Sequence, residues 1–184
     1  MYILAIDQGT TGTTSIIINA STMDVIDKVN HEFPQIFPEP GWVEHNLNNI
    51  WDTVEQTVTS VLKETNIQPS DIKCIGITNQ RETTCAFDRS GSPLANAIVW
   101  QDRRTNEFCR QLKEKGLESI FKEKAGLPLD PYFSGTKMHW LLNNNEQVKE
   151  AAKKSNLLFG TIDSFLLYKL SGNISHKTDA SNAS

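Results

Sequence analysis

The first fourteen residues constrain the fold of this chain more than any other segment. An apolar run at residues 2–6 leads to Asp7, and a short loop with Gly9, Gly12 and several threonines follows. Residues 15–19 are again apolar and rich in β-branched side chains, which predicts a β-hairpin with the loop at its tip. No lysine follows the second glycine, so the segment is not the strand-to-helix turn of a P-loop.

The chemistry of this loop suits phosphate. Glycines at positions 9 and 12 allow backbone N–H groups to approach an anion closely, and the hydroxyls of Thr10 and Thr11 add donors. The carboxylate of Asp7 suits Mg²⁺, which prefers oxygen ligands and retains several waters. The alternative is an ordinary glycine-containing hairpin. Short glycine-rich matches are common by chance, so the loop alone leaves both readings open.

Composition narrows the classes of partner. The chain has 184 residues and a formal net charge of −4, which gives no general attraction to nucleic acid or to an anionic membrane. No apolar run approaches the length of a membrane span, and the N-terminal segment lacks the basic region of a signal peptide. Cys74, Cys85 and Cys109 are odd in number and show no C-x-x-C spacing. We therefore expect a cytoplasmic protein with reduced thiols.

The remaining pattern alternates strands and helices, which predicts an α/β domain with a mixed sheet. Further strands are predicted at residues 25–33, 72–78, 83–87, 94–100 and 157–160, and helices from Asn46 and at about 105–115, 117–124, 135–143, 147–154 and 162–170. The strand at 72–78 is expected to be buried, and 83–87 with 94–100 to form a second hairpin. Three prolines make residues 33–42 a long loop, with Trp42 as a core or anchoring residue.

Four further motifs lead to a family. They occupy residues 40–45 (Pro-Gly-Trp-Val-Glu-His), 76–84 (Gly-Ile-Thr-Asn-Gln-Arg-Glu-Thr-Thr), 96–104 (Asn-Ala-Ile-Val-Trp-Gln-Asp-Arg-Arg) and 130–137 (Asp-Pro-Tyr-Phe-Ser-Gly-Thr-Lys). Together with residues 7–11 and 158–163, they make the chain resemble the FGGY carbohydrate kinases from residue 2 to residue 184, and in particular the members that phosphorylate glycerol. The motif at 7–11 is shared with other actin-like ATPases, but these four are not.

The resemblance implies a fold and an activity. The family has a ribonuclease-H-like, actin-like ATPase fold, a pair of domains of which residues 1–184 would be the N-terminal, polyol-binding one, ending before that domain is complete. The implied reaction transfers the γ-phosphoryl group of ATP to glycerol with Mg²⁺, giving sn-glycerol 3-phosphate. The family's catalytic base is an aspartate before a glutamine in a later motif, so we assign no catalytic residue and expect this chain alone to be inactive. The implied complete protein is a homodimer or homotetramer.

The resemblance assigns glycerol binding to four residues. Arg81 and Glu82 would bind the hydroxyls, since a guanidinium donates hydrogen bonds and a carboxylate accepts them. Their alternative is a surface salt bridge, which contributes little stability. Tyr132 would donate to the polyol, or else be a packing residue. Trp100 would line the carbon chain of glycerol, or else be a core residue. Gln80 is expected near the site, either lining or supporting it.

The resemblance also assigns residues to the binding of the nucleotide and its metal ion. Asp7 would organise Mg²⁺, and Thr10, Thr11 and Gly12 would contact the phosphates. Thr14 is the fourth nucleotide-binding candidate, although the family commonly carries arginine at its position. A lost cation beside polyphosphate weakens charge neutralisation unless another basic group replaces it.

Two other functions remain open from the sequence. The first is an FGGY kinase for another polyol or sugar, such as xylulose or erythritol; the combination of Arg81, Glu82, Trp100 and Tyr132 argues against it. The second is a non-catalytic polyol-binding module. A downstream Asp-Gln pair and a Gly-Gly adenine loop would distinguish the enzyme from the module.

Overall fold

The computed structural model describes residues 1–182 of the 184-residue chain. The chain divides into two compact units that are interleaved in sequence. The first unit combines Met1–Pro34 with Leu47–Gln80, and the second combines Gln35–Asn46 with the chain from Arg81 onward. None of the helices formed by residues 1–182 is long and apolar enough to cross a bilayer.

The first unit is built on a four-stranded mixed sheet in the order β3-β2-β1-β5. Its strands are β1 (Tyr2–Gln8), β2 (Gly12–Asn19), β3 (Val25–Glu32) and β5 (Ile72–Asn79). The first three form an antiparallel meander, and β5 pairs with β1 in parallel. The predicted hairpin is confirmed, with residues 9–11 at its tip, and so is the α/β class with a mixed sheet. The first strand continues two residues beyond the expected end at residue 6, so Asp7 lies within β1.

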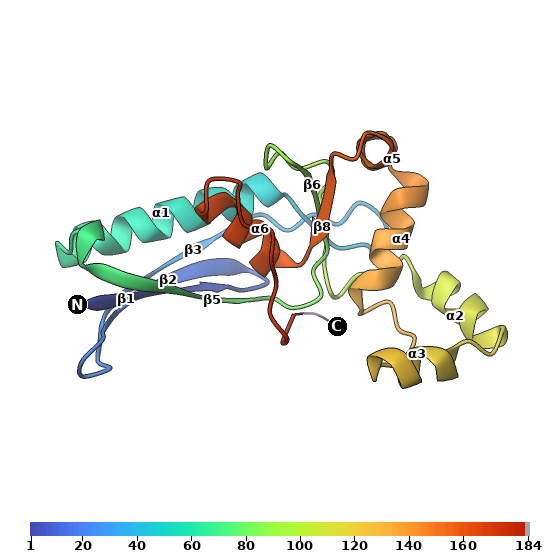
Figure 1. Cartoon of the computed structure of the whole chain (residues 1–184), viewed down its shortest axis with the longest axis horizontal. Helices are drawn as coiled ribbons and strands as arrows, with labels where there is room; N and C mark the ends of the chain where they lie inside the picture. Colours follow the sequence, from blue (N-terminus) through green and yellow to red (C-terminus); the bar gives the residue numbers. More distant parts are fainter. Residues whose placement is uncertain (183–184) are drawn as a thin grey trace. The chain divides into compact units, whose positions relative to one another are not determined.

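A single long helix covers one face of this sheet. Helix α1 (Leu47–Thr65) packs against β2 and β3, and Figure 1 shows it lying along the strands. Its amphipathic pattern predicted this arrangement, because Ile50, Val54 and Val61 recur at three-to-four spacing and are buried. The helix begins one residue after the predicted start at Asn46. A short 3₁₀ turn (Pro69–Asp71) then leads into β5.

The expectation that residues 72–78 form a buried strand is wrong in one respect. The strand exists as β5, but most of its side chains are exposed, including Cys74 and Ile75, the latter by 47%. The reason is its place in the sheet. Within residues 1–182, β5 is an edge strand paired with β1 alone, and α1 packs mainly over β2 and β3.

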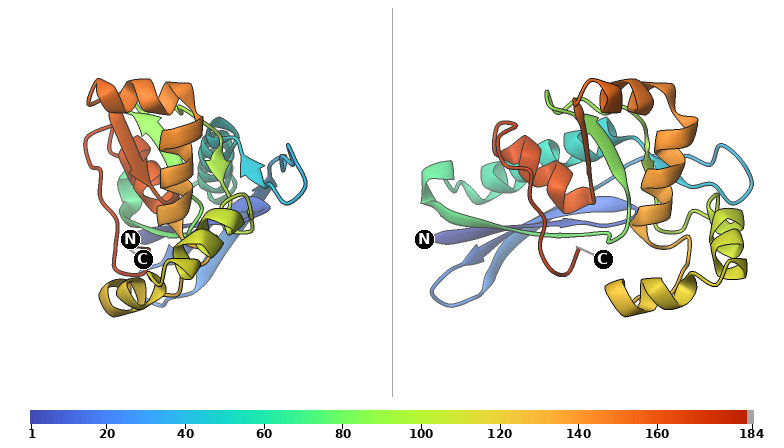
Figure 2. Two further views of the ribbon diagram at one scale, coloured as in Figure 1. Left: turned by 90° about the vertical axis from the view of Figure 1, so that its right-hand side faces the viewer. Right: turned by 45° about the vertical axis from the view of Figure 1, so that its right-hand side comes forward.

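Up to residue 182, the second unit contains four short strands and five helices. The strands β4 (Glu44–His45) and β7 (Ala97–Ile98) pair, as do β6 (Cys85–Asp88) and β8 (Leu157–Gly160). The helices are α2 (Asn106–Glu114), α3 (Glu118–Ala125), α4 (Ser134–Asn144), α5 (Glu146–Lys153) and α6 (Ile162–Leu170). All five predicted helices are confirmed to within about two residues. Figure 2 shows α5 following α4, with α2 and α3 near the start of α4.

The core of the second unit lies on both sides of β6. On one side, the ring of Phe87 is 5.3 Å from that of Phe165 in α6. On the other, Ala86 belongs to a buried cluster with Leu141 of α4 and Val148 of α5. The strands β6 and β8 therefore lie between α6 and the α4–α5 pair (Figure 1).

The predicted second hairpin is confirmed only in part. The N–H of Leu94 donates to the carbonyl of Ala86, so the chain does turn back beside β6. The expected strand at 94–100 is regular only at Ala97–Ile98. The shortening has a structural reason, since Ile98 bridges Thr84 on one side and pairs with β4 on the other, and only this short stretch meets both partners.

The proline-rich loop at 33–42 is irregular as predicted, and Trp42 anchors its end. The guanidinium of Arg104 lies 3.8 Å from the centre of a Trp42 ring. The same guanidinium forms ion pairs of 2.8 Å with Asp102 and with Glu44, and the N–H of Val43 donates to Asp102. Because Arg104 is almost fully buried, these contacts fix the loop to the segment that precedes α2.

Candidate functional site

The loop at the tip of the first hairpin is closed by its own backbone. The N–H of Gly9 donates to the carbonyl of Gly12 over 2.8 Å. The buried side chain of Gln80 donates to Gln8 Oε1 at 2.9 Å and to the Gly9 carbonyl at 3.1 Å. Gln80 therefore supports the loop through Gln8 and Gly9, which sequence reasoning had left undecided.

Packing between strands gives a reason for glycine at position 12 that the sequence did not show. A Cβ atom there would lie 2.7 Å from the carbonyl oxygen of His31 in β3, which is far too close. At Gly9 a Cβ atom would lie 3.3 Å from the Gly12 carbonyl, a tight but less severe contact. The close approach of β3 is thus sufficient to require Gly12, whether or not phosphate binds.

A row of polar residues crosses the sheet at the position of Asp7. Asp7 is exposed and pairs in register with Thr14 on β2 and with Thr78 on β5, and Thr14 pairs with Asn30 on β3. The amide of Asn30 donates to the Thr14 hydroxyl over 2.9 Å. Residues paired across strands share a face of the sheet, so Thr14 is the direct neighbour of the carboxylate predicted to organise Mg²⁺.

The donors in this region fit a magnesium ion held mainly by phosphate. Asp7 offers a carboxylate, and Thr10 and Thr11 at the loop tip offer hydroxyls, all of them oxygen donors. Among residues 1–182 there is no group of three or more His, Cys, Asp or Glu side chains that could hold a metal ion. A single carboxylate is nevertheless sufficient where phosphate oxygens and water complete the shell, as is usual for Mg²⁺.

The candidate polyol-binding residues belong to the second unit and begin with a strained turn. Arg81 is exposed, whereas Glu82 is buried, so the two do not match the alternative of a surface salt bridge. Glu82 has a φ of 65°, a left-handed conformation that costs a non-glycine residue about 1–3 kcal/mol. Such strain persists only where the surroundings impose it, and it is concentrated at functional sites.

The carboxylate of Glu82 is held at the start of α4. Its Oε2 atom accepts from the Ser134 backbone N–H at 2.9 Å and from the Ser134 hydroxyl at 2.8 Å. The positive end of the helix dipole favours an anion there. A carboxylate has about four acceptor sites, and the N–H and hydroxyl of Ser134 both donate to one oxygen, Oε2.

Two aromatic side chains accompany Glu82. The rings of Trp100 and Tyr132 meet edge to face, with their centres 6.0 Å apart. The backbone N–H of Trp100 donates to the hydroxyl of Thr83, the residue after Glu82, over 3.3 Å. Both aromatic residues are half-buried, so neither is a plain core residue. The structure therefore gathers Glu82, Trp100 and Tyr132 in one region, beside Arg81 in the chain.

A buried lysine that sequence reasoning missed connects two of these residues. The ammonium of Lys137 donates to the backbone carbonyl of Glu82 at 2.8 Å and to that of Tyr132 at 2.5 Å. Burial lowers the pKa of Lys137 to about 8, which leaves it mostly protonated at neutral pH. The available signal was its place four residues before Leu141, which puts a charge on the apolar face of a predicted helix.

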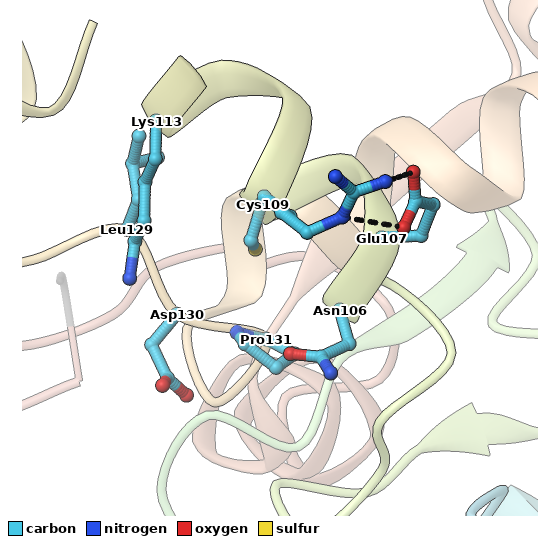
Figure 3. Close-up of a pocket in the computed structure, with 8 residues that line it drawn as sticks. Asn106, Glu107, Cys109, Lys113, Leu129, Asp130 and Pro131 are labelled. Atoms are coloured by element: carbon cyan, nitrogen blue, oxygen red, sulfur yellow. Dashed lines mark hydrogen bonds and ion pairs between the residues drawn. The ribbon is translucent and has the colours of Figure 1, made fainter. Parts of the chain in front are cut away.

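A hollow of about 250 Å³ with a mixed lining lies beside α2 and is separate from the predicted residues (Figure 3). It is lined by Cys109, Lys113 and Asp130 among others, and burial raises the pKa of the Cys109 thiol. Arg110 and Glu107, which also line it, form an exposed ion pair of 2.6 Å. None of the candidate glycerol- or nucleotide-binding residues lines this hollow.

The fold and the residue set define a class of protein. The chain belongs to the FGGY family of carbohydrate kinases, since residues 2–184 match the N-terminal domain of that family. This confirms the family that the sequence motifs predicted.

Within the family, the chain is similar to glycerol kinases. It is 51% identical over 184 residues to a glycerol kinase from Geobacillus sp. (strain WCH70) and 53% identical over 184 residues to that of Bacillus subtilis (strain 168). In both cases the match covers 100% of this chain and 37% of the relative. The crystal structure of Plasmodium falciparum glycerol kinase with ADP matches with a TM-score of 0.92 at 32% identity, covering 99% of this chain and 36% of that one. The chain thus spans little more than a third of the length of these relatives.

Proposed function

We propose that this chain is the polyol-binding N-terminal domain of an ATP-dependent glycerol kinase. The complete protein would transfer the γ-phosphoryl group of ATP to a terminal hydroxyl of glycerol, giving sn-glycerol 3-phosphate. The observation that carries the proposal is the grouping of Glu82, Trp100 and Tyr132, with Glu82 fixed in a strained turn by Ser134 and Lys137. Identities of 51% and 53% to glycerol kinases support glycerol as the acceptor.

In this proposal the second unit recognises glycerol. The guanidinium of Arg81 donates to glycerol oxygens, and the carboxylate of Glu82 accepts from glycerol hydroxyls. Tyr132 donates a further hydrogen bond through its phenol, and the ring of Trp100 covers the carbon chain. Holding the acceptor in one orientation is the main contribution of the protein, since phosphoryl transfer depends on positioning and electrostatics.

The first unit binds the phosphates in the same proposal. Thr10, Thr11, Gly12 and Thr14 contact the nucleotide, and Asp7 organises Mg²⁺. The ion would supply charge neutralisation on the phosphate oxygens. The hydrogen bonds of Gln80 to Gln8 and Gly9 hold the loop in place for this role.

We assign the catalytic base and the adenine site to a part of the complete protein outside these 184 residues. The chain covers 37% of the length of its curated relatives, and we place both in the remaining part of a protein of that length. The proposal also includes a homodimeric or homotetrameric complete protein in the cytoplasm. Free thiols at Cys74, Cys85 and Cys109 support a reducing compartment.

A panel of acceptors tests the proposed function. The complete gene product is assayed with ATP and Mg²⁺ and with glycerol, erythritol, xylulose or gluconate as acceptor. The proposal predicts that kcat/KM is highest for glycerol, because Arg81, Glu82, Trp100 and Tyr132 are matched to a short triol. A higher value for xylulose, erythritol or gluconate would instead assign the chain to another FGGY kinase, and the absence of any phosphorylation would favour a binding module.

A further inference from the structure

Lys137 occupies an unusual position for a lysine. Its side chain is fully buried in α4, so it is not exposed to contact a ligand from solvent. Burying an ammonium is costly unless hydrogen bonds satisfy it, and here backbone carbonyls accept from it. A leucine or methionine would fill the same space without that cost. Packing alone therefore does not explain why a charged side chain occupies this position.

The two carbonyls that accept from Lys137 come from separate segments. Glu82 lies in the turn after β5, and Tyr132 lies in the loop before α4, fifty residues further along the chain. The lysine is the shared donor between them, at 2.8 Å and 2.5 Å. Removal of the ammonium would therefore leave the two carbonyls without the donor that joins their segments.

The backbone of Glu82, whose carbonyl accepts from Lys137, is in a strained conformation. With a φ of 65°, Glu82 would relax to a commoner conformation if its surroundings allowed it. The Lys137 ammonium holds its carbonyl and Ser134 holds its carboxylate, so the residue is fixed at both ends. The Glu82 carbonyl also accepts from the hydroxyls of Ser134 and Thr84, each at 3.3 Å, so Lys137 is the shortest of its three donors. Loss of the ammonium would weaken the hold on this turn.

We propose that Lys137 is a positioning residue for the polyol site, which sets the distance and orientation between Glu82 and Tyr132 through their backbone carbonyls. This inference rests on the proposed function, since it concerns residues assigned to glycerol there. It predicts that Lys137 affects the binding of the acceptor and leaves the binding of ATP unchanged.

The test compares two Michaelis constants in the complete gene product. Lys137→Met removes the cation and keeps a side chain of similar length. We expect the KM for glycerol to rise about 10- to 100-fold, since small displacements of positioned groups have effects of this size, with the KM for ATP unchanged. Lys137→Gln keeps an N–H donor and should show a smaller rise, which amounts to a partial rescue.

Two control variants separate positioning from general destabilisation. Leu141→Ala removes a core side chain from the same helix and should lower the melting temperature while leaving the KM for glycerol unchanged. Lys149→Met breaks only the surface ion pair with Glu146 and should change neither property. An unchanged KM for glycerol in whichever Lys137 variant folds, or equal rises in both Michaelis constants, would overturn the inference. Failure of the proposed function is distinguishable, because the unsubstituted protein would then not phosphorylate glycerol.

Discussion

At the scale of single residues, burial sets the protonation of His45. This side chain is fully buried in the second unit, and its Nε2 atom lies 2.6 Å from Gln35 Oε1. Burial lowers the pKa of His45 from 6.5 to about 4, because a buried imidazolium loses its hydration. The unfolded chain therefore binds a proton on His45 at a pH where the folded protein does not.

This difference predicts how stability depends on pH. As the pH falls from about 6.5 to about 4, the free energy of unfolding should decrease, by up to roughly 3 kcal/mol from His45 alone. His45→Gln should remove that part of the slope in urea unfolding curves measured across this range. Leu141→Ala removes a buried side chain that does not titrate, so it is the control and should retain the full slope. Equal slopes for the unsubstituted protein and His45→Gln would refute the account.

The roles of single residues stay predictions. Residues 7–14 predicted phosphate binding through their glycines and hydroxyls, and residues 76–84 predicted polyol binding through the family resemblance. The burial of Glu82 and its bonds to Ser134 could not be predicted, since these partners are separated by about fifty residues. The place of Lys137 on the apolar face of a predicted helix marked it as unusual, but its acceptors could not be predicted, because they are backbone carbonyls.

At the scale of elements, Arg104 links the short strand β4 to the segment before α2. Its guanidinium neutralises Asp102 and Glu44 and packs on the rings of Trp42 and Trp140. Arg104→Leu would leave two carboxylates in a largely buried place without a cation. We expect a loss of about 3–5 kcal/mol in the free energy of unfolding, measured by chemical denaturation.

Arg110 provides a matched control for this prediction. It also contacts two carboxylates, those of Glu107 and Glu114, but all three side chains are exposed. Exposed ion pairs contribute little because water and salt screen them, so Arg110→Leu should leave the unfolding curve nearly unchanged. Similar losses for Arg104→Leu and Arg110→Leu would show that the Arg104 network does not stabilise the fold as described.

The predicted elements were most accurate where periodicity was strong. The spacing of Ile50, Val54 and Val61 predicted α1, whose start lies within a residue of the expected one. The apolar runs on either side of residues 9–11 predicted the first hairpin. Burial of β5 was wrong because an apolar run does not reveal whether a strand lies at the centre or the edge of a sheet. The strand at 94–100 was shortened to Ala97–Ile98 by pairing with β4, which lies about fifty residues earlier.

At the scale of the whole molecule, the chain matches only part of the length of its relatives, so we expect it to lack part of the catalytic machinery. The 184-residue chain corresponds to 37% of the curated glycerol kinases that it matches. We predict that the purified chain alone shows no ATP-dependent glycerol phosphorylation in a coupled assay, because the proposal places the base in the remaining part. Turnover by the purified chain that scales with its concentration would contradict this division.

The most direct test of the central claim is the kinetics of Arg81→Ala in the complete gene product. If Arg81 binds glycerol hydroxyls, removal of its guanidinium loses charge-assisted hydrogen bonds of about 1.5–3 kcal/mol. The KM for glycerol should then rise by roughly 10- to 150-fold while the KM for ATP stays constant. A KM for glycerol equal to that of the unsubstituted protein would show that the residues after β5 do not form the acceptor site.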